Sequence, residues 1–381
     1  MKVMICSSDN CATSGAFLCM FELCRYMKNE NIEILVILPS NGTGTELLKK
    51  HNINYKIVKS YSWVMPINGG IIKRIKSFIK LVLNYRAINE LVYIIRTYNI
   101  DIVHSNSTWT YVGIAAAKKC GVKCVWHLRE AMELSQGLYV SYKKEYIEEL
   151  IKYTNCFIAV SRFVEHYFRE KKYVNKIYTI YDAVDSNRYY NSQKKLFKDK
   201  FVNIIMVNAV YPGKGQDELL DALTYLKKEV LGSIRVYIVG DVQCDLMYTK
   251  KLRKFILING LQHQVKFLGV IRDIENVYLK GDISCICSPY EAFGRVTIES
   301  MLSGCVVLGC NSGATKEIIM NEQTGLLYQS GDCVDLAKKI EYILLHKENM
   351  IKMARNGQDY AIKHFSVDKN GESIYKIYKQ I

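Results

Sequence analysis

The sequence lacks any apolar run long enough to cross a membrane. A spanning helix needs about 20 predominantly apolar residues, and no segment of this 381-residue chain approaches that length. The first apolar run, Val3 to Cys6, leads directly into Ser7-Ser8-Asp9 and is too short for the core of a secretory signal peptide. The sequence therefore predicts a protein that neither spans a membrane nor is secreted by that route, and we expect it in the cytoplasm.

Paired cysteines are also lacking. The chain has 13 cysteines but no Cys-x2-Cys spacing, which excludes the commonest zinc sites. Several cysteines lie in apolar, strand-like runs, so reduced thiols buried in the protein core are expected instead. These cysteines are Cys6, Cys156, Cys285, Cys287 and Cys310. We expect no metal ion and no cofactor.

Acidic residues are scarce relative to basic ones. The 52 Lys and Arg residues outnumber the 37 Asp and Glu residues, which gives a formal net charge of +15. Such a balance suits nucleic acid, an anionic lipid surface or a phosphorylated substrate. No nucleic-acid-binding motif accompanies the charge, so we expect no nucleic-acid partner.

The sequence does contain a regular alternation of short apolar runs and longer helical patterns, which is typical of an α/β fold with parallel sheets. A polar stretch, 186–200, interrupts the alternation, and the length of the chain favours two domains over one. We therefore predict a first domain over residues 1–190 and a second over 191–360. The runs expected to form strands are 3–6, 34–38, 102–104, 124–126 and 156–160 in the first domain, and 202–207, 236–239, 265–267, 283–287 and 305–308 in the second.

The most informative motif is Glu291-Ala-Phe-Gly-Arg-Val-Thr-Ile-Glu299, in which two carboxylates bracket a glycine-containing turn at the start of a predicted helix. Backbone N–H groups in a first helical turn have no partner within the helix, so residues from Gly294 to Thr297 can bind a diphosphate. Glu299 can accept hydrogen bonds from two ribose hydroxyls, and Glu291 from hydroxyls of a transferred sugar. The motif therefore predicts a sugar-nucleotide site.

Further motifs appear in order along nearly the whole chain. They are Ala159-Val160-Ser161, Asp182-Ala183-Val184-Asp185, Gly213-Lys214-Gly215-Gln216, Ser303-Gly304, Asn311 to Glu317 and Thr324-Gly325. With the Glu291 motif, they resemble the retaining glycosyltransferases of family 4, or glycosyl transferases group 1. The resemblance implies a GT-B fold: two facing Rossmann-like domains, the first for the acceptor and the second for the nucleotide sugar, with a central cleft between them. It also implies that a C-terminal helix, here residues 361–381, crosses back to the first domain.

The resemblance implies catalytic roles for Lys214, Glu291 and His127. Lys214 lies in a Gly-Lys-Gly turn and is expected to bind the departing diphosphate. Family members often have an arginine five residues before this lysine, where this sequence has Ala209; Arg295 is a cation that can compensate. The residues expected to bind the donor are Gly15, Gly213, Phe293, Gly294, Arg295, Val296, Thr297 and Glu299.

Residues after the first-domain strands are expected to meet the acceptor and the sugar. In similar enzymes a histidine at the place of His127 contacts the transferred sugar; a histidine satisfied within the core is the alternative. Arg129 and Glu130 are expected to form an ion pair on the acceptor wall. Asn106 is a further acceptor-binding candidate, or a turn-forming asparagine. Gly15 belongs to a loop that resembles the family's donor-facing loop but lacks the usual glycine pair.

Residues 71–98 form a predicted helix with a strongly basic face. The cations of this helix are Lys73, Arg74, Lys76, Lys80, Arg86 and Arg96, against the single acid Glu90. Because Ile, Leu, Val and Phe recur among them at helical spacing, the helix can lie on an anionic membrane surface. A solvated basic face is the alternative. Peripheral attachment to the inner face of a membrane is therefore a hypothesis for this segment.

The sequence predicts a retaining, metal-independent glycosyltransferase of the hexosyltransferase type. It would transfer a sugar from a nucleoside diphosphate sugar to a carbohydrate or lipid-linked acceptor, in the synthesis of a cell-surface polysaccharide or glycolipid. Two alternatives stay open: a non-hydrolysing sugar-nucleotide epimerase, and a catalytically silent subunit that holds a partner transferase, which Ala209 suggests. A double-displacement hydrolase is disfavoured because Glu299, beside the ribose, is too remote to attack the anomeric carbon.

Overall fold

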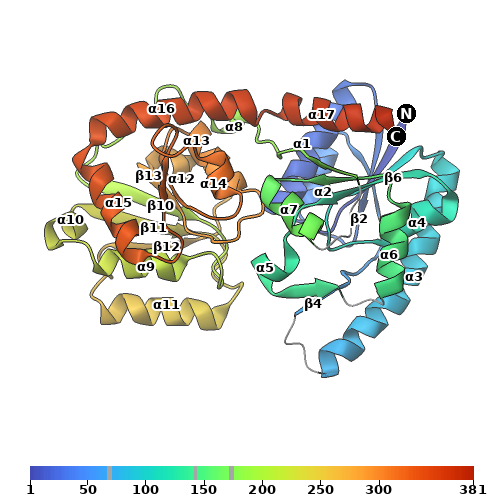
Figure 1. Ribbon diagram of the computed structural model, residues 1–381, viewed down its shortest axis with the longest axis horizontal. Coiled ribbons are helices and arrows are strands. Elements are labelled where there is room, and N and C mark those ends of the chain that lie inside the picture. The colour runs from blue at the N-terminus through green and yellow to red at the C-terminus, as the bar shows by residue number, and fades with distance from the viewer. Residues whose placement is uncertain (67–70, 141–143, 171–175) are drawn as a thin grey trace. The chain divides into compact units, whose positions relative to one another are not determined.

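The computed structural model describes residues 1–66, 71–140, 144–170 and 176–381, which fold into two compact units (Figure 1). The first unit joins Met1–Ala183 to the C-terminal segment Val367–Ile381, and the second contains Val184–Ser366. The chain thus divides between Ala183 and Val184, whereas the sequence suggested a position near 190. The returning segment begins at Val367 and not at 361.

The first unit is built on a seven-stranded parallel sheet in the order β3-β2-β1-β5-β6-β8-β9. Its central strands are apolar runs buried almost completely, as expected for a parallel sheet covered on both faces. The strand order reverses at β1, which pairs with β2 on one side and β5 on the other. The strands are β1 Lys2–Cys6, β2 Glu33–Leu38, β3 Asn54–Ile57, β5 Ile102–Ser105, β6 Lys123–Leu128, β8 Cys156–Ala159 and β9 Ile177–Thr179. A separate antiparallel pair consists of β4 Val64–Pro66 and β7 Leu138–Val140.

The C-terminal helix, α17 Val367–Gln380, returns to the first unit as the sequence predicted. It packs on α1, and its residues Ile374, Ile377 and Tyr378 are buried in the same core as strands β1 and β2. The other helices of this unit are α1 Gly15–Asn29, α2 Gly44–Lys50, α3 Ile71–Tyr98, α4 Val112–Cys120, α5 Met132–Gln136, α6 Lys144–Tyr153 and α7 Arg162–Glu170.

The second unit has a six-stranded parallel sheet in the order β12-β11-β10-β13-β14-β15. Here the order reverses at β10, so the loops after β10 and β13 leave neighbouring strands at the reversal, where open α/β sheets bind their ligands. The strands are β10 Val202–Val207, β11 Ile234–Val239, β12 Val265–Gly269, β13 Ile283–Ile286, β14 Val306–Cys310 and β15 Leu326–Tyr328. The helices are α8 Ser186–Tyr189, α9 Gln216–Thr224, α10 Lys228–Gly232, α11 Leu246–Ile258, α12 Glu275–Lys280, α13 Arg295–Leu302, α14 Thr315–Ile318, α15 Cys333–Leu345 and α16 Lys347–His364.

The cysteines expected in the cores are all buried there as free thiols. They are Cys6 and Cys156 in the first unit and Cys285, Cys287 and Cys310 in the second. Within the described ranges, no helix combines the length and the apolar character that crossing a membrane requires.

Candidate functional site

An ion pair joins the loops after β10 and β13. Lys214 Nζ lies 3.0 Å from Glu291 Oε2, and the Ser288 hydroxyl donates to the Gly213 carbonyl oxygen at 3.0 Å. Gly215, which follows the lysine, has a left-handed backbone with φ of 78°, and a Cβ there would lie 2.3 Å from the Cys287 carbonyl oxygen. Only glycine allows this approach, so the sequence of the loop sets Lys214 against the end of β13.

The ammonium group of Lys214 is held in its charged form. Burial opposes the charge, but the interactions with the Glu291 carboxylate and with Tyr211 together outweigh it and raise the pKa of Lys214 above its usual value. About a fifth of each side chain stays exposed, 17% for Lys214 and 19% for Glu291. A ligand can therefore reach a preformed pair of opposite charges.

Helix α13 begins beside this pair. Its N-cap is Gly294, with φ of 88°, which has no side chain to cap the first turn. The Thr297 side chain in the first turn is fully buried, and its Oγ1 has no hydrogen-bond partner among the described residues. A Cβ at Gly294 would come within 3.1 Å of this oxygen and 3.3 Å of Glu291 Cγ. The glycine therefore keeps space open between the helix start and the carboxylate.

Glu299 lies deeper and is bound within the protein. Arg295 Nε donates to its Oε1 at 2.8 Å, and the Tyr278 hydroxyl donates to its Oε2 at 2.9 Å. Burial, together with the Glu299 charge, also raises the pKa of Tyr189. A carboxylate accepts about four hydrogen bonds, so Glu299 can still accept from a ligand. The sequence motif contains Arg295 but not Tyr278 or Tyr189, whose proximity no local pattern signals.

The other residues expected to bind the donor occupy varied surroundings. Arg295 is paired with Glu299 and is 9% exposed, so its charge is already balanced within the helix. Phe293 is buried against the edge of Phe365, and Val296 is half-buried. Ala209 follows β10, and its carbonyl oxygen accepts from the Gln216 side chain at 3.0 Å. Gly15, in the first unit, is the exposed first residue of α1.

His127 belongs to the first unit, near the end of β6. It is fully buried, and its Nδ1 lies 3.1 Å from Nε2 of His104. Nδ1 of His104 in turn lies 2.5 Å from the hydroxyl of Tyr378 on α17. The Nε2 atom of His127 has no hydrogen-bond partner among the described residues. A chain of three side chains therefore ends in a buried ring nitrogen whose hydrogen-bonding capacity is not used by the described residues.

The direction of hydrogen bonding along this chain follows from Arg129. Its guanidinium lies 3.5 Å from His127 Nδ1, and because a guanidinium only donates, that nitrogen must accept. His104 then donates from Nε2 and accepts at Nδ1 from the Tyr378 hydroxyl. The proton of neutral His127 consequently resides on Nε2, which is a donor.

The prediction of an ion pair between Arg129 and Glu130 is wrong. Arg129 instead forms a buried ion pair with Asp182 and donates to Asn106 Oδ1 at 3.1 Å. Glu130 accepts from the Ser107 hydroxyl at 2.7 Å and from the Thr108 backbone and side chain. The two side chains of adjacent residues have separate partners, and Asp182 comes from a part of the sequence far from β6.

Stability is expected to fall below neutral pH because of the two buried histidines. Burial, with the nearby Arg129 charge, lowers the pKa of His104 to about 3 and that of His127 well below its ordinary 6.5. Below pH 6.5 the unfolded chain therefore binds protons that the folded protein does not. The unfolding free energy should decrease from pH 6.5 toward 3, by roughly 1 kcal/mol per pH unit for each histidine. Urea unfolding between pH 7 and 5 measures the slope.

A His104→Asn variant removes one of the two groups and should show a shallower slope than the wild type. The exposed His263 provides the matched control, since His263→Asn should keep the wild-type slope. Equal slopes for the His104→Asn variant and the wild type would contradict the assignment.

The site residues divide between the units. Lys214, Glu291 and Glu299 belong to the second, and His127, Asn106, Arg129 and Glu130 to the first. Among the described residues, no group of three or more His, Cys, Asp or Glu side chains is arranged to hold a metal ion.

Two family models match consecutive parts of the chain. The model described as Glycosyltransferase Family 4 matches residues 13–188, and the one described as Glycosyl transferases group 1 matches residues 188–360. An uncharacterized glycosyltransferase of Methanocaldococcus jannaschii is 26% identical over 296 residues, which cover 76% of this chain and 78% of that protein.

A further relative and a solved structure extend the comparison. An α-1,4-N-acetyl-D-galactosaminyltransferase of Campylobacter jejuni, named for an undecaprenol-diphosphate-linked saccharide, is 26% identical over 179 residues, or 47% of this chain and 48% of that protein. The crystal structure of Anabaena HepE in complex with UDP-glucose matches with a TM-score of 0.82 and 22% identity, and covers 100% of both chains. The predicted α/β fold of the GT-B type is confirmed.

Proposed function

The chain belongs to the glycosyltransferases of family 4, which act on sugar nucleotides, and we propose that it transfers a hexose, with retention, to a lipid-linked saccharide. The observation that carries the proposal is the cluster at the ends of β10 and β13. There Lys214 and Glu291 pair beside the start of α13. A cation and a helix N-terminus suit a diphosphate, and the neighbouring carboxylate suits sugar hydroxyls.

Departure of the nucleoside diphosphate leaves negative charge on its outer phosphate. Lys214 and the backbone at the start of α13 receive that charge, and fixed donors of this kind lower a barrier by a few kcal/mol each. When the diphosphate binds, it competes with Glu291 for Lys214 and leaves the carboxylate available to sugar hydroxyls. Because a lysine and backbone amides supply the positive charge, the proposed reaction needs no metal ion.

The sugar is held by His127 in this proposal. Its Nε2 proton, set by the Arg129 guanidinium at Nδ1, can donate to an oxygen of the transferred sugar, and the chain from Tyr378 through His104 holds the ring in place. Both histidines are neutral at physiological pH because of their lowered pKa values. The orientation of His127 therefore depends on a residue of the C-terminal helix, and Tyr378 acts as a positioning residue.

A uridine nucleotide and a polyprenyl-linked acceptor are the substrates we propose. The Anabaena structure contains UDP-glucose, and the Campylobacter relative is named for an acceptor on undecaprenol diphosphate. The proposed product then belongs to a cell-surface polysaccharide or glycolipid, and the protein works at the cytoplasmic face of a membrane.

The test combines binding and turnover. A thermal-shift screen over UDP, GDP and ADP sugars should show the largest rise in apparent stability with a UDP sugar, because a ligand that binds only the folded state stabilises it. With that donor, nucleoside diphosphate should be released only when a saccharide acceptor is present, in buffer with or without EDTA. An epimerase would release none net and would change the donor sugar. A silent subunit would neither release nucleotide nor alter the sugar.

Membrane attachment is proposed through α3. Of its cations, Lys76 and Arg86 are exposed and Lys80 is half-buried, while the side chains of Lys73 and Arg74 lie outside the described residues. Each cation near an anionic surface contributes roughly 1 kcal/mol. Replacing Lys76, Lys80 and Arg86 with Gln should therefore abolish sedimentation with anionic vesicles at low salt and leave donor binding unchanged.

The matched control replaces three exposed lysines of the second unit, Lys250, Lys251 and Lys254, with Gln. This variant loses the same charge from α11 and should sediment like the wild type. If both variants lose sedimentation equally, the attachment depends on net charge and not on α3. A wild-type protein that does not sediment with the vesicles would refute membrane attachment.

A further inference from the structure

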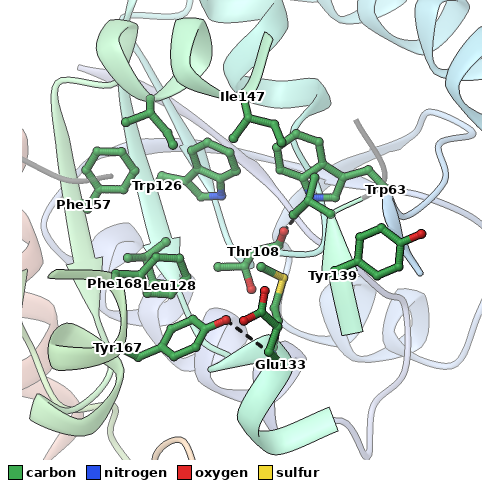
Figure 2. A pocket seen from close by; sticks show the side chains of 13 residues that line it. Trp63, Thr108, Trp126, Leu128, Glu133, Tyr139, Ile147, Phe157, Tyr167 and Phe168 are labelled. Carbon is green, nitrogen blue, oxygen red and sulfur yellow. Dashed lines mark hydrogen bonds between the residues drawn. The ribbon is translucent and has the colours of Figure 1, made fainter. Parts of the chain in front are cut away.

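A partly open, mainly apolar cavity of about 230 Å³ lies in the first unit, and none of the residues assigned above to sugar and diphosphate lines it (Figure 2). It is lined by side chains from β6, β7, β8, α5, α6 and α7 together with Trp63, which precedes β4. The principal apolar residues of its wall are Trp63, Trp126, Leu128, Ile147, Phe157 and Phe168.

Several polar atoms of the wall are already bonded within the protein, while the Glu133 carboxylate and the Tyr139 hydroxyl also belong to the lining. The indole N–H of Trp63 donates to the Thr108 carbonyl oxygen at 2.7 Å, and that of Trp126 to the Ser107 carbonyl oxygen at 3.0 Å. The Tyr167 hydroxyl accepts from the Glu133 backbone N–H at 3.4 Å (Figure 2). The two indoles therefore turn carbon faces toward the cavity. A sugar ring placed against the mainly apolar wall would leave most of its hydroxyls without partners, which is costly, so a hydrocarbon chain suits this surface better.

The cavity shares its wall with residues of the proposed acceptor site. Trp126 and Leu128 line it on β6, and His127 between them points to the opposite face of the strand, as alternation requires. Thr108 also lines the cavity, and its backbone N–H and hydroxyl both donate to Glu130. Only Thr108 would thus separate an acceptor headgroup near Glu130 from the cavity.

The same wall is tied to α3. The Asn84 side chain on α3 accepts from the Tyr61 backbone N–H and donates to its carbonyl oxygen, both at 2.8 Å, two residues before Trp63. The turns of α3 that precede Asn84 expose large apolar side chains, among them Ile75, Phe78 and Val82, with Phe78 at 68%. Exposed apolar side chains together with cations suit contact with an anionic lipid surface.

We propose that the cavity binds the hydrocarbon chain of the lipid-linked acceptor, at the end next to its phosphate-linked saccharide. An apolar cavity of about 150 Å³ takes up benzene, so this larger one has room for one or two isoprene units or a short run of methylenes. The inference rests on the proposed function for the identity of the acceptor. It adds a site that recognises the lipid and not the sugar.

Tryptophan fluorescence provides the test, because two of the three tryptophans, Trp63 and Trp126, line the cavity. Farnesol and 1-dodecanol, each below its aggregation limit, should change the emission of the wild-type protein saturably, and maltose should not. Tighter binding of farnesol would indicate a prenyl chain, and tighter binding of 1-dodecanol a straight acyl chain.

Two variants change the wall of the cavity at half-buried positions: Ile147→Glu places a charge in the wall, and Val140→Phe fills the cavity. Both should weaken binding by at least about tenfold.

Leu257→Glu, at a 69% exposed position of the second unit, introduces the same charge away from the cavity and should bind like the wild type. Thermal melts identify any variant that fails to fold, and binding by one folded wall variant at wild-type affinity overturns the proposal. So does saturable binding of maltose in place of the alcohols.

The transfer assay separates this inference from the proposed function. The wild type should use a farnesyl-diphosphate-linked saccharide at least about tenfold more efficiently than the free saccharide, and the wall variants should lose this preference while keeping activity on the free saccharide. Alcohol binding without any transfer supports the cavity and refutes the transferase. Transfer without alcohol binding refutes the cavity alone.

Discussion

Replacing Lys214 with Ala is expected to lower kcat by a factor of about 10²–10³, the usual effect of removing one fixed donor to a developing charge. KM for the donor should rise much less, because the charge that Lys214 meets grows during bond cleavage and is smaller in the bound donor. Steady-state kinetics over donor concentration, with acceptor in excess, give both terms.

The surroundings of Lys214 make this experiment interpretable. Its partner Glu291 is 19% exposed, so the carboxylate can be hydrated in the variant and the fold should persist. Lys254→Ala, on the exposed face of α11 in the same unit, is the matched control and should keep wild-type kinetics. If the Lys214→Ala variant keeps the wild-type kcat, and its kcat/KM falls only as much as its affinity for the donor, then Lys214 contributes to binding only.

Replacing Glu299 with Ala should destabilise the protein as well as weaken donor binding. The motif alone suggests a residue whose partners belong to the ligand, so that its removal would leave stability unchanged. In the structure the substitution strands the buried Arg295 guanidinium, which is 9% exposed, and removes the acceptor of Tyr278. Breaking a buried pair in this way costs about 3–5 kcal/mol, which urea unfolding measures.

A double variant separates the two roles of Glu299. Arg295→Met combined with Glu299→Met replaces the whole pair by apolar side chains, and such a replacement is often close to neutral for stability. This variant should recover most of the lost unfolding free energy but still bind the UDP sugar poorly in calorimetry. Donor affinity equal to that of the wild type would remove Glu299 from the site, and full stability in the single variant would remove its structural role.

Local patterns were sufficient for the framework of this protein. Apolar runs such as 202–207 and 283–287 correspond to β10 and β13, because a strand buried on both faces must be apolar along its length. The turn around Gly215 and the start of α13 at Gly294 could also be anticipated, since glycine is the residue that accepts a left-handed backbone at low cost. The cysteines in these runs became buried free thiols for the same reason.

The partners of the site residues could not be anticipated. Arg129 and Glu130 are adjacent and oppositely charged, yet Arg129 pairs with Asp182, which is 53 residues away. Glu299 accepts from Tyr278, 21 residues before it. No sequence pattern indicates that Tyr278 contacts Glu299 or that Asp182 contacts Arg129. Charge and proximity in sequence are poor guides where strands and helices bring distant segments together.

By itself the sequence determined the strands, the glycine turns and the family, because each depends on residues that are close together or in a fixed order. Only the tertiary structure decided which side chains meet. The hydrogen bond between His104 and Tyr378 joins residues 274 positions apart and helps to hold His127 through His104. The cavity exists because segments from residue 63 to residue 168 together line it. Such contacts follow from the packing of whole elements, which no window of the sequence contains.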